Sequence, residues 1–333
     1  MPRSVLVTST SFIDTPGQHI ERLNECNYNL QFARGPLEED ELMKIIESSE
    51  GFDGILCGRD NFTSRVLEKY SPRLKVISRY GVGLDRIDLD AAAKLGISLQ
   101  NTPRLNHTTV SELTFGLMIS LARRIPEHVT QVRQGDWNRL TGYEMRNKTL
   151  AIFGFGMVGR EVAKLALAFG MKVLVYNSSW SEVHENYFAA LKSSFRNELL
   201  WGDARHIDRC IEAEEALRNA DFISLHMDLN RNNAHFINAK NIEVCKQGVF
   251  IVNVSRGGLV NEAALAQYIA SGKVAGYATD VLEHQPPKSN SPLLNMPNVI
   301  TTPHLGGRTF DSVIKQGILA VDNLVTGLNS QDN

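Results

Sequence analysis

Cysteine is scarce in this chain, and long hydrophobic runs are missing. The four cysteines, Cys26, Cys57, Cys210 and Cys245, lie far apart, none forms a CxxC pair, and no histidine cluster accompanies them. This spacing argues against a disulfide scaffold and a zinc site, and is typical of reduced proteins. No apolar stretch approaches the roughly 20 residues of a membrane-spanning helix, and residues 1–10 lack the apolar core of a signal peptide. We therefore expect a cytoplasmic protein that holds no metal.

An excess of charge of either sign is also missing. Lysine and arginine number 35 against 37 for aspartate and glutamate, so the formal net charge is −2. Nucleic acid and anionic membranes are bound through clusters of positive charge, and neither is an expected partner. An acidic small molecule would have to be captured by a few local cations.

The chain does contain a regular alternation of short apolar runs with amphipathic segments. Its 333 residues suggest two domains. Strands that alternate with helices predict parallel sheets. Strands are predicted at residues 5–8, 54–57, 74–78, 97–99, 150–153, 172–176, 222–225, 249–253, 274–279 and 299–301. Helices are predicted at residues 38–49, 64–70, 89–95, 110–123, 125–134, 158–169 and 309–326. The turn at residues 101–103 places a domain boundary there.

Residues 178–209 depart from this pattern. A connection in an α/β unit usually takes about two to six residues, and this one is far longer. Its apolar residues lie among charges, which predicts an inserted amphipathic helix followed by a loop; they are Phe188, Leu191, Phe195, Leu199, Leu200 and Trp201. Two roles stay open for the insertion, namely surface or subunit packing and a lid over a bound cofactor.

The clearest motif is a GxGxxG turn made of Gly154, Phe155, Gly156, Met157, Val158 and Gly159. It follows a predicted strand and begins a predicted amphipathic helix, which is the context that makes the motif informative. The first glycine permits a tight turn, the second lets the backbone approach a pyrophosphate, and the third lets helix and strand pack closely. The helix N-terminus presents N–H groups to the phosphates. We expect a dinucleotide to bind here.

Asn177 follows the next predicted strand, where dinucleotide-binding domains usually carry an acidic residue for the ribose hydroxyls. An amide can still hydrogen-bond a ribose hydroxyl, but it does not repel a 2′-phosphate as a carboxylate would. No arginine or lysine follows directly to bind such a phosphate. The choice between NAD and NADP therefore stays open, and we favour NAD.

Six segments resemble, in the same order, the D-isomer-specific 2-hydroxyacid dehydrogenases, in particular phosphoglycerate-dehydrogenase-like members. They are RYGVGLDRID at 79–88, NTPRLNHTTVSE at 101–112, the glycine motif, NVSRGG at 253–258, DVLEHQP at 280–286 and TPHLGG at 302–307. An ordered set of motifs is far more specific than any one of them.

The resemblance implies an α/β fold of two Rossmann-like doubly wound parallel-sheet domains, one inserted in the other. Residues 1–101 and 305–333 would form the substrate-binding domain, and residues 102–304 the NAD-binding domain. A helical arm over residues 110–136 would form a homodimer contact. No regulatory domain is expected after the closing helix.

Arg256 and His304 are the catalytic candidates. Arg256 follows a predicted strand at the end where α/β sheets bind ligands, and its guanidinium can hold a 2-oxo carboxylate at two points. Hydride transfer to a carbonyl leaves an alkoxide that needs a proton near neutral pH, and histidine is suited to donate it and take it back. The resemblance gives this role to His304.

Gln285 is the most informative departure from the family pattern. The family usually has a glutamate before Pro286, which orients the histidine and favours its charged form. A glutamine can hold the ring through a hydrogen bond but adds no charge. Three interpretations stay open: Gln285 orients His304 in an enzyme with altered pH behaviour, a shifted loop lets Glu283 serve, or the protein has little dehydrogenase activity.

The resemblance alone implies the remaining site residues. Asp280 would contact the nicotinamide carboxamide. The backbone of the turn at Tyr80, Gly81, Val82 and Gly83 would bind the substrate carboxylate, with Asn106 nearby. Arg79 and Arg59 are candidates for binding a second anionic group such as phosphate, although both also fit ordinary surface charges at strand ends.

These features predict an NAD-dependent dehydrogenase that moves a hydride between nicotinamide and a small 2-hydroxy or 2-oxo acid. Candidate substrates are 3-phosphoglycerate, a related phosphorylated or phosphonylated acid, and another acid of a specialised pathway. The alternative is a scaffold or sensor that binds NAD(H) and a protein partner with little turnover. Gln285 favours this alternative, whereas Arg256 and His304 argue against it.

Overall fold

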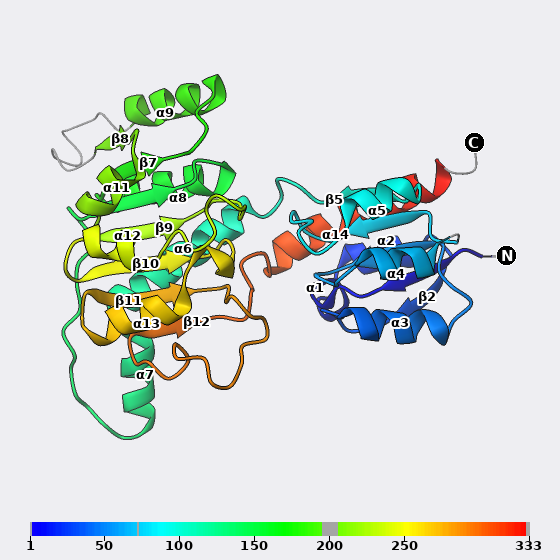
Figure 1. The fold of residues 1–333 in the computed structure, drawn as a ribbon, viewed down its shortest axis with the longest axis horizontal. Coiled ribbons are helices and arrows are strands. Elements are labelled where there is room, and N and C mark those ends of the chain that lie inside the picture. Colours follow the sequence, from blue (N-terminus) through cyan, green and yellow to red (C-terminus); the bar gives the residue numbers. More distant parts are fainter. Residues whose placement is uncertain (1, 72, 195–205, 331–333) are drawn as a thin grey trace. The chain divides into compact units, whose positions relative to one another are not determined.

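The computed structural model describes residues 2–71, 73–194 and 206–330 (Figure 1). Contacts divide the chain into two compact units, Met1–Asn106 with Gly307–Asn333 (unit 1) and His107–Gly306 (unit 2). The sequence placed the corresponding boundaries at 101/102 and 304/305. Each unit is built on one all-parallel sheet, which confirms the predicted fold class.

Unit 1 has five strands in the order β2-β1-β3-β4-β5. The strands are β1 (Ser4–Val7), β2 (Asn29–Phe32), β3 (Gly54–Cys57), β4 (Val76–Arg79) and β5 (Ser98–Asn101). The helices are α1 (Thr10–Asp14), α2 (Gln18–Asn24), α3 (Glu39–Glu47), α4 (Ser64–Tyr70), α5 (Leu89–Lys94) and α14 (Phe310–Asn329). Helix α14 comes from the far end of the chain and packs on β3 and β4, so unit 2 is inserted within unit 1.

Unit 2 has seven strands in the order β12-β11-β10-β9-β6-β7-β8. They are β6 (Thr149–Phe153), β7 (Lys172–Tyr176), β8 (Ile207–Arg209), β9 (Phe222–Leu225), β10 (Val249–Asn253), β11 (Val274–Thr279) and β12 (Val299–Thr301). The helices are α6 (His107–Ala122), α7 (Ile125–Arg133), α8 (Met157–Ala168), α9 (Glu182–Ser194), α11 (Ala213–Asn219), α12 (Ala239–Val244), the 3-10 helix η1 (Gly257–Leu259) and α13 (Glu262–Ala270). The strand order reverses at β6, which lies between β7 and β9. Doubly wound sheets bind ligands outside the carboxyl ends of their strands at such a reversal.

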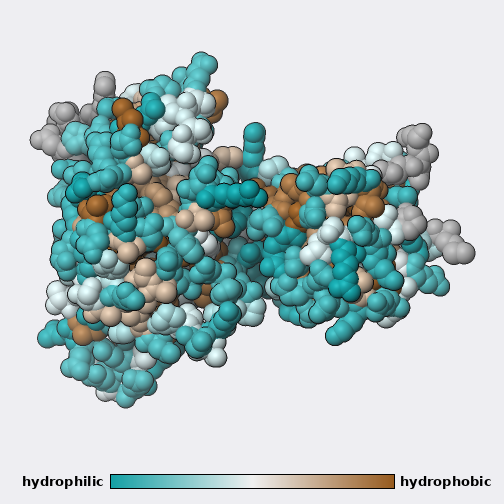
Figure 2. Space-filling model, viewed as in Figure 1, coloured by the Kyte–Doolittle hydropathy of each residue, from teal (hydrophilic) through white to brown (hydrophobic). Residues whose placement is uncertain are grey.

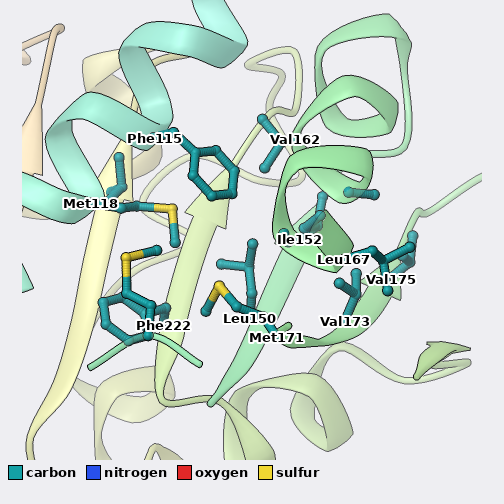
Figure 3. Close-up of a cluster of buried hydrophobic side chains, with 14 of the residues drawn as sticks. Phe115, Met118, Leu150, Ile152, Val162, Leu167, Met171, Val173, Val175 and Phe222 are labelled. Atoms are coloured by element: carbon teal, nitrogen blue, oxygen red, sulfur yellow. The ribbon is translucent and has the colours of Figure 1, made fainter. Parts of the chain in front are cut away.

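The sheet of unit 2 is buried on both faces. Helices α6 and α8 cover one face, and α11, α12 and α13 cover the other. In Figure 3, Phe115 and Met118 of α6 and Val162 of α8 lie against Leu150 and Ile152 of β6. Burial on both faces explains why the inner strands of this sheet are nearly continuous apolar runs.

Several elements of the described residues were not predicted from the sequence, among them β2, β8, α1 and α2. Strand β2 lies at the edge of its sheet and is largely exposed, and β8 has only three residues, so neither produces an apolar run. Helices α1 and α2 are short, and each buries only one or two side chains, which leaves no helical period to detect.

The long segment at residues 178–209 contains the predicted amphipathic helix, which is α9. Its side chains Phe188 and Leu191 are buried against the core on the α8 face. Phe195, Leu199, Leu200 and Trp201 lie outside the described residues. The lid role considered for this segment stays a prediction.

The molecular face in Figure 2 is mostly hydrophilic, with apolar residues in small separate patches. Within the described part of the chain, no helix has both the length and the apolar character needed to cross a bilayer. The same residues contain no cluster of three histidine, cysteine or acidic side chains that could hold a metal ion.

Candidate active site

The glycine-rich turn joins β6 to α8 at the reversal point of the unit 2 sheet. Gly154 has a φ of +101°, and a Cβ there would lie 2.4 Å from the carbonyl oxygen of His226. A Cβ on Gly159 would lie 2.0 Å from the carbonyl oxygen of Gly154. Gly156 is the N-cap of α8, and a Cβ on it would meet nothing within 4 Å. The first and third glycines are therefore required by the fold, whereas the second borders open space at a helix N-terminus, a position that favours phosphate groups. The pyrophosphate contact expected here stays a prediction.

Asn177 ties this turn to the end of β7. Its Oδ1 accepts a hydrogen bond from the Phe155 N–H at 2.9 Å, and its Nδ2 donates to the Ser179 carbonyl. Phe155 is buried and stacks on Trp180, with their rings 3° from parallel and 5.6 Å apart. Both polar atoms of the Asn177 side chain thus have partners within the chain. The ribose contact expected of Asn177 stays a prediction.

Arg256 follows β10 at the carboxyl edge of the same sheet. Its half-buried side chain donates a hydrogen bond from Nη1 to the Ser255 carbonyl at 2.9 Å. The next residue, Gly257, lies directly against the backbone of Leu282, since a Cβ on Gly257 would be 2.1 Å from the Leu282 carbonyl oxygen. The segment that carries Gln285 therefore packs beside the Arg256 backbone.

His304 and Gln285 are in direct contact. The Gln285 Oε1 lies 2.9 Å from the His304 Nδ1, and the Gln285 Nε2 donates to the Leu282 carbonyl at 3.0 Å. The second bond fixes the amide, because the reversed orientation would bring two oxygens together. An amide oxygen only accepts hydrogen bonds, so Nδ1 of His304 must carry the hydrogen. Nε2 is then the ring nitrogen that changes its protonation.

Buried Asp280 holds the turn that carries His304. His304 has a φ of +54°, a left-handed conformation that residues other than glycine rarely adopt. Oδ1 of Asp280 accepts hydrogen bonds from the Thr302 hydroxyl at 2.7 Å and the Leu305 N–H at 2.8 Å, and Oδ2 accepts one from the Gly306 N–H at 2.7 Å. Burial raises the pKa of Asp280, and these bonds act in the opposite direction. This anchoring role was missed in the sequence, and the nicotinamide contact of Asp280 stays a prediction.

Glu283 is bonded away from the imidazole of His304. Its Oε1 lies 2.9 Å from the Nε2 of His235, and its backbone N–H donates to Oε1 of Glu262 at 2.7 Å. Of the two side chains considered as partners of His304, the geometry brings Gln285 to the ring and Glu283 to His235.

In unit 1, the turn at residues 80–83 is held by bonds within the unit. The N–H of Tyr80 donates to the Cys57 carbonyl at 2.9 Å, and the N–H of Gly81 donates to the Thr102 hydroxyl at 2.8 Å. The carboxylate-binding role expected of this turn stays a prediction, and the N–H groups of Tyr80 and Gly81 are already bonded within the unit.

The arginines considered for a second anion differ in their surroundings. Arg79 is only 9% exposed, and its Nε donates to the Gly83 carbonyl at 3.1 Å, so its side chain stabilises the turn. Arg59 follows β3 at the carboxyl edge of the unit 1 sheet and is half-buried. Asn106 is the last residue of the first segment of unit 1. Substrate contacts of Arg59 and Asn106 stay predictions.

Known proteins resemble this chain in sequence and in structure. The sequence model of the NAD-binding domain of D-isomer specific 2-hydroxyacid dehydrogenases matches residues 115–306. The hydroxypyruvate reductase of Thermotoga maritima is 36% identical over 299 residues, which cover 89% of this chain and 90% of that protein. The D-3-phosphoglycerate dehydrogenase of Methanocaldococcus jannaschii is 36% identical over 291 residues, or 86% of this chain and 51% of the relative. The chain thus spans about half the length of that dehydrogenase.

A solved structure agrees with these matches. The TT0316 protein of Thermus thermophilus superposes with a TM-score of 0.82 at 30% identity, over 98% of this chain and 97% of that one. The resemblance stated from six motifs is thereby confirmed over nearly the whole chain. The chain belongs to the D-isomer-specific 2-hydroxyacid dehydrogenase family and is an NAD-dependent oxidoreductase.

Proposed function

We propose that this chain catalyses reversible hydride transfer between NAD(H) and a small 2-oxo or 2-hydroxy acid, with His304 as the proton donor and acceptor. The observation that carries the proposal is the 2.9 Å contact between Gln285 Oε1 and His304 Nδ1, at the carboxyl edge of the sheet that bears the glycine turn. The contact directs Nε2 of the ring to the proton transfer that carbonyl reduction requires.

Each catalytic side chain then has a defined task. Bound NADH supplies the hydride. Arg256 holds the carboxylate of the acid and polarises its carbonyl through charge-assisted hydrogen bonds. His304 donates a proton from Nε2 to the developing alkoxide during reduction and takes it back during oxidation. Gln285 keeps the hydrogen on Nδ1, but it stabilises the imidazolium less than a carboxylate would.

The cofactor would bind to residues 154–159, with its pyrophosphate above Gly156 and the first turn of α8. Asn177, Ser178 and Ser179 carry no charge that would repel a 2′-phosphate. We propose that NAD(H) is the working cofactor and that NADP(H) is discriminated against only weakly. Asp280 would contact the nicotinamide carboxamide.

We propose that unit 1 binds the substrate, through the turn at residues 80–83, Asn106 and Arg59. The relatives described above are named for hydroxypyruvate and D-3-phosphoglycerate. Either acid, or a related phosphorylated or phosphonylated acid, has a second polar group that an arginine at the carboxyl edge of the unit 1 sheet could bind. Arg59 is the better candidate for this contact, because Arg79 is only 9% exposed and its Nε is bonded to the Gly83 carbonyl.

We also propose a cytoplasmic homodimer formed through the arm made of α6, α7 and the segment that follows. Helix α7 buries none of its own residues, its side chains Ile125, Val129 and Val132 are exposed, and Trp137 is 80% exposed. Apolar surface gathered in this way favours a partner that covers it. Sedimentation equilibrium of the protein and of a Val132→Asp, Trp137→Ser variant tests this contact.

A substrate panel tests the proposed function. Hydroxypyruvate, glyoxylate and the 2-oxo acid of 3-phosphoglycerate are offered with NADH and with NADPH, and the absorbance of the reduced nicotinamide is followed. We expect turnover of at least one acid and its loss in His304→Asn. The scaffold alternative is favoured by the uncharged Gln285, and it predicts tight NADH binding without turnover of any acid.

A further inference from the structure

Three polar side chains near the catalytic loop, those of Glu262, Glu283 and His235, have no part in the proposed reaction. Glu262 begins α13, is half-buried, and its Oε1 accepts a hydrogen bond from the backbone N–H of Glu283 at 2.7 Å. The side chain of Glu283 reaches the other way, and its Oε1 lies 2.9 Å from the His235 Nε2. Glu283 is thus held by its backbone on one side and by its carboxylate on the other.

His235 is itself firmly placed. Its φ is +52°, its backbone N–H donates to the Gly258 carbonyl at 2.8 Å, and its carbonyl accepts a bond from the Asn238 Nδ2 at 2.8 Å. A left-handed conformation in a residue other than glycine persists only where the surroundings fix it. The Gly258 carbonyl, two residues after Arg256, therefore fixes the backbone of His235, and the His235 side chain in turn contacts Glu283.

Glu283 directly follows Leu282, whose carbonyl orients the Gln285 amide. Residues 281–286 form neither helix nor strand, so side-chain contacts and packing must fix their position. The Leu282 carbonyl lies against Gly257 and accepts the bond from Gln285 Nε2. A movement of Leu282 would turn the Gln285 amide and draw Oε1 away from His304.

We propose that Glu262, together with the Glu283–His235 pair, is a positioning group that sets the Gln285–His304 hydrogen bond by clamping residues 281–286. The proposal rests on the proposed role of His304 in proton transfer. Glu262 is the stronger arm, because a carboxylate that accepts a backbone N–H forms a short charge-assisted bond. The Glu283 and His235 side chains are 38% and 44% exposed, and a pair so exposed contributes little by itself.

The first test reads the imidazole directly and needs no turnover. Nitrogen-15 labelled histidine NMR reports which ring nitrogen of neutral His304 carries the hydrogen, and His304→Asn assigns the signal. We expect Nδ1–H in the protein, a clear loss of that form in Glu262→Ala and its retention in Glu262→Gln, whose amide oxygen still accepts the Glu283 N–H. A tautomer that is unchanged in Glu262→Ala would overturn the proposal.

The second test is a kinetic cycle with Gln285. Glu262→Ala is expected to lower kcat for reduction about ten-fold, with KM for the oxo acid nearly unchanged, since it removes one charge-assisted hydrogen bond to the loop that carries Gln285 and keeps Arg256 itself. Glu283→Gln is expected to lower kcat only about two-fold, because the Glu283 and His235 side chains are exposed and their contact contributes little. In a Gln285→Ala background, Glu262→Ala should have no further effect.

Glu243→Ala is the matched control, because Glu243 bonds the Tyr268 hydroxyl of α13 at 2.6 Å without touching the loop. Its kcat should equal that of the unaltered protein. If the effects of Glu262→Ala and Gln285→Ala multiply, Glu262 acts through the fold as a whole, and the positioning proposal is wrong. If the unaltered protein turns over no acid, the proposed function fails, and the NMR result still decides the positioning.

Discussion

The side-chain oxygen of Gln285 lies 2.9 Å from Nδ1 of His304, on a turn where His304 has a left-handed backbone. The bond from Gln285 Nε2 to the Leu282 carbonyl makes this oxygen face the ring, so the ring nitrogen is the donor. The contact supplies the orientation that a carboxylate partner would give, without its charge. Orientation and charge are therefore separable in this protein by single substitutions.

Arg256→Gln should weaken the binding of 2-oxo acids about 100-fold while NADH binding stays nearly constant. The substitution removes a charge-assisted, two-point contact with the substrate carboxylate. Arg256→Lys keeps the charge but loses the planar guanidinium. We expect its affinity for 2-oxo acids to lie between those of the unaltered protein and Arg256→Gln. Titration calorimetry with each ligand measures both effects. An equal loss of both ligands would show that Arg256 supports the fold instead.

The glycine turn gives a matched pair of substitutions. Gly156→Ala should fold normally, because a Cβ there meets nothing within 4 Å, but it should weaken NADH binding at least about ten-fold by intruding on the pyrophosphate. Gly154→Ala should destabilise the protein by about 3 kcal/mol or more, because its φ is +101° and the new Cβ would meet the His226 carbonyl. Thermal unfolding and NADH titration separate the two. Tight NADH binding by Gly156→Ala would place the pyrophosphate elsewhere.

Asn177→Asp should raise the preference for NAD over NADP by about ten-fold, since a carboxylate accepts the ribose hydroxyls and repels a 2′-phosphate. The variant keeps an oxygen to accept the Phe155 N–H but loses the donor to Ser179, so the 177–180 turn is expected to loosen. Asn177→Ser, which adds no charge, is the control. The kcat/KM ratio for the two cofactors is the readout, and an unchanged ratio means that this position does not face the ribose.

Elements with local constraints were predictable from the sequence. β7, β9, β10 and β11 matched their predicted bounds because strands buried on both faces need continuous apolar residues. The glycine turn was equally predictable, since a side chain on Gly154 or Gly159 would clash with backbone atoms of the turn or beside it. The edge strand β2 was not, because an exposed strand needs no such pattern.

Bonds between distant segments were not predictable. Asp280 anchors a turn 22 to 26 residues away, and Glu283 pairs with His235 48 residues away. Which loops meet at the carboxyl edge depends on the strand order, and a single sequence does not reveal the partner of each side chain there. Gln285 could be flagged as unusual from its motif, but its amide orientation depends on the Leu282 carbonyl.

His226 should make the protein sensitive to acid. It follows β9 with Nε2 2.7 Å from the Ser224 hydroxyl, and burial lowers its pKa to about 3. The unfolded chain takes up this proton at about pH 6.5, so the stabilisation is complete above that pH and is lost as the pH falls from 6.5 toward 3. The slope is at most about 1.4 kcal/mol per pH unit.

Urea unfolding at pH 7 and pH 5 measures this loss. His226→Gln should reduce the difference between the free energies of unfolding at the two pH values, because the glutamine side chain does not titrate. His128→Gln, in which the replaced histidine lies on α7, is the control. It should keep the full difference in free energy of unfolding between pH 7 and pH 5. If His226→Gln keeps it as well, other groups cause the acid sensitivity.

The pH dependence of kcat/KM for reduction of one 2-oxo acid, measured for the unaltered protein, Gln285→Glu and Gln285→Ala, tests the central claim most directly. Reduction needs the protonated form of His304, so its rate falls as the pH rises. We predict that Gln285→Glu moves this fall to higher pH by about one unit, because the carboxylate stabilises the imidazolium. Gln285→Ala should lower the plateau without that shift, since it removes only the orientation. Profiles of the unaltered protein and Gln285→Glu that coincide over the whole pH range would contradict the account.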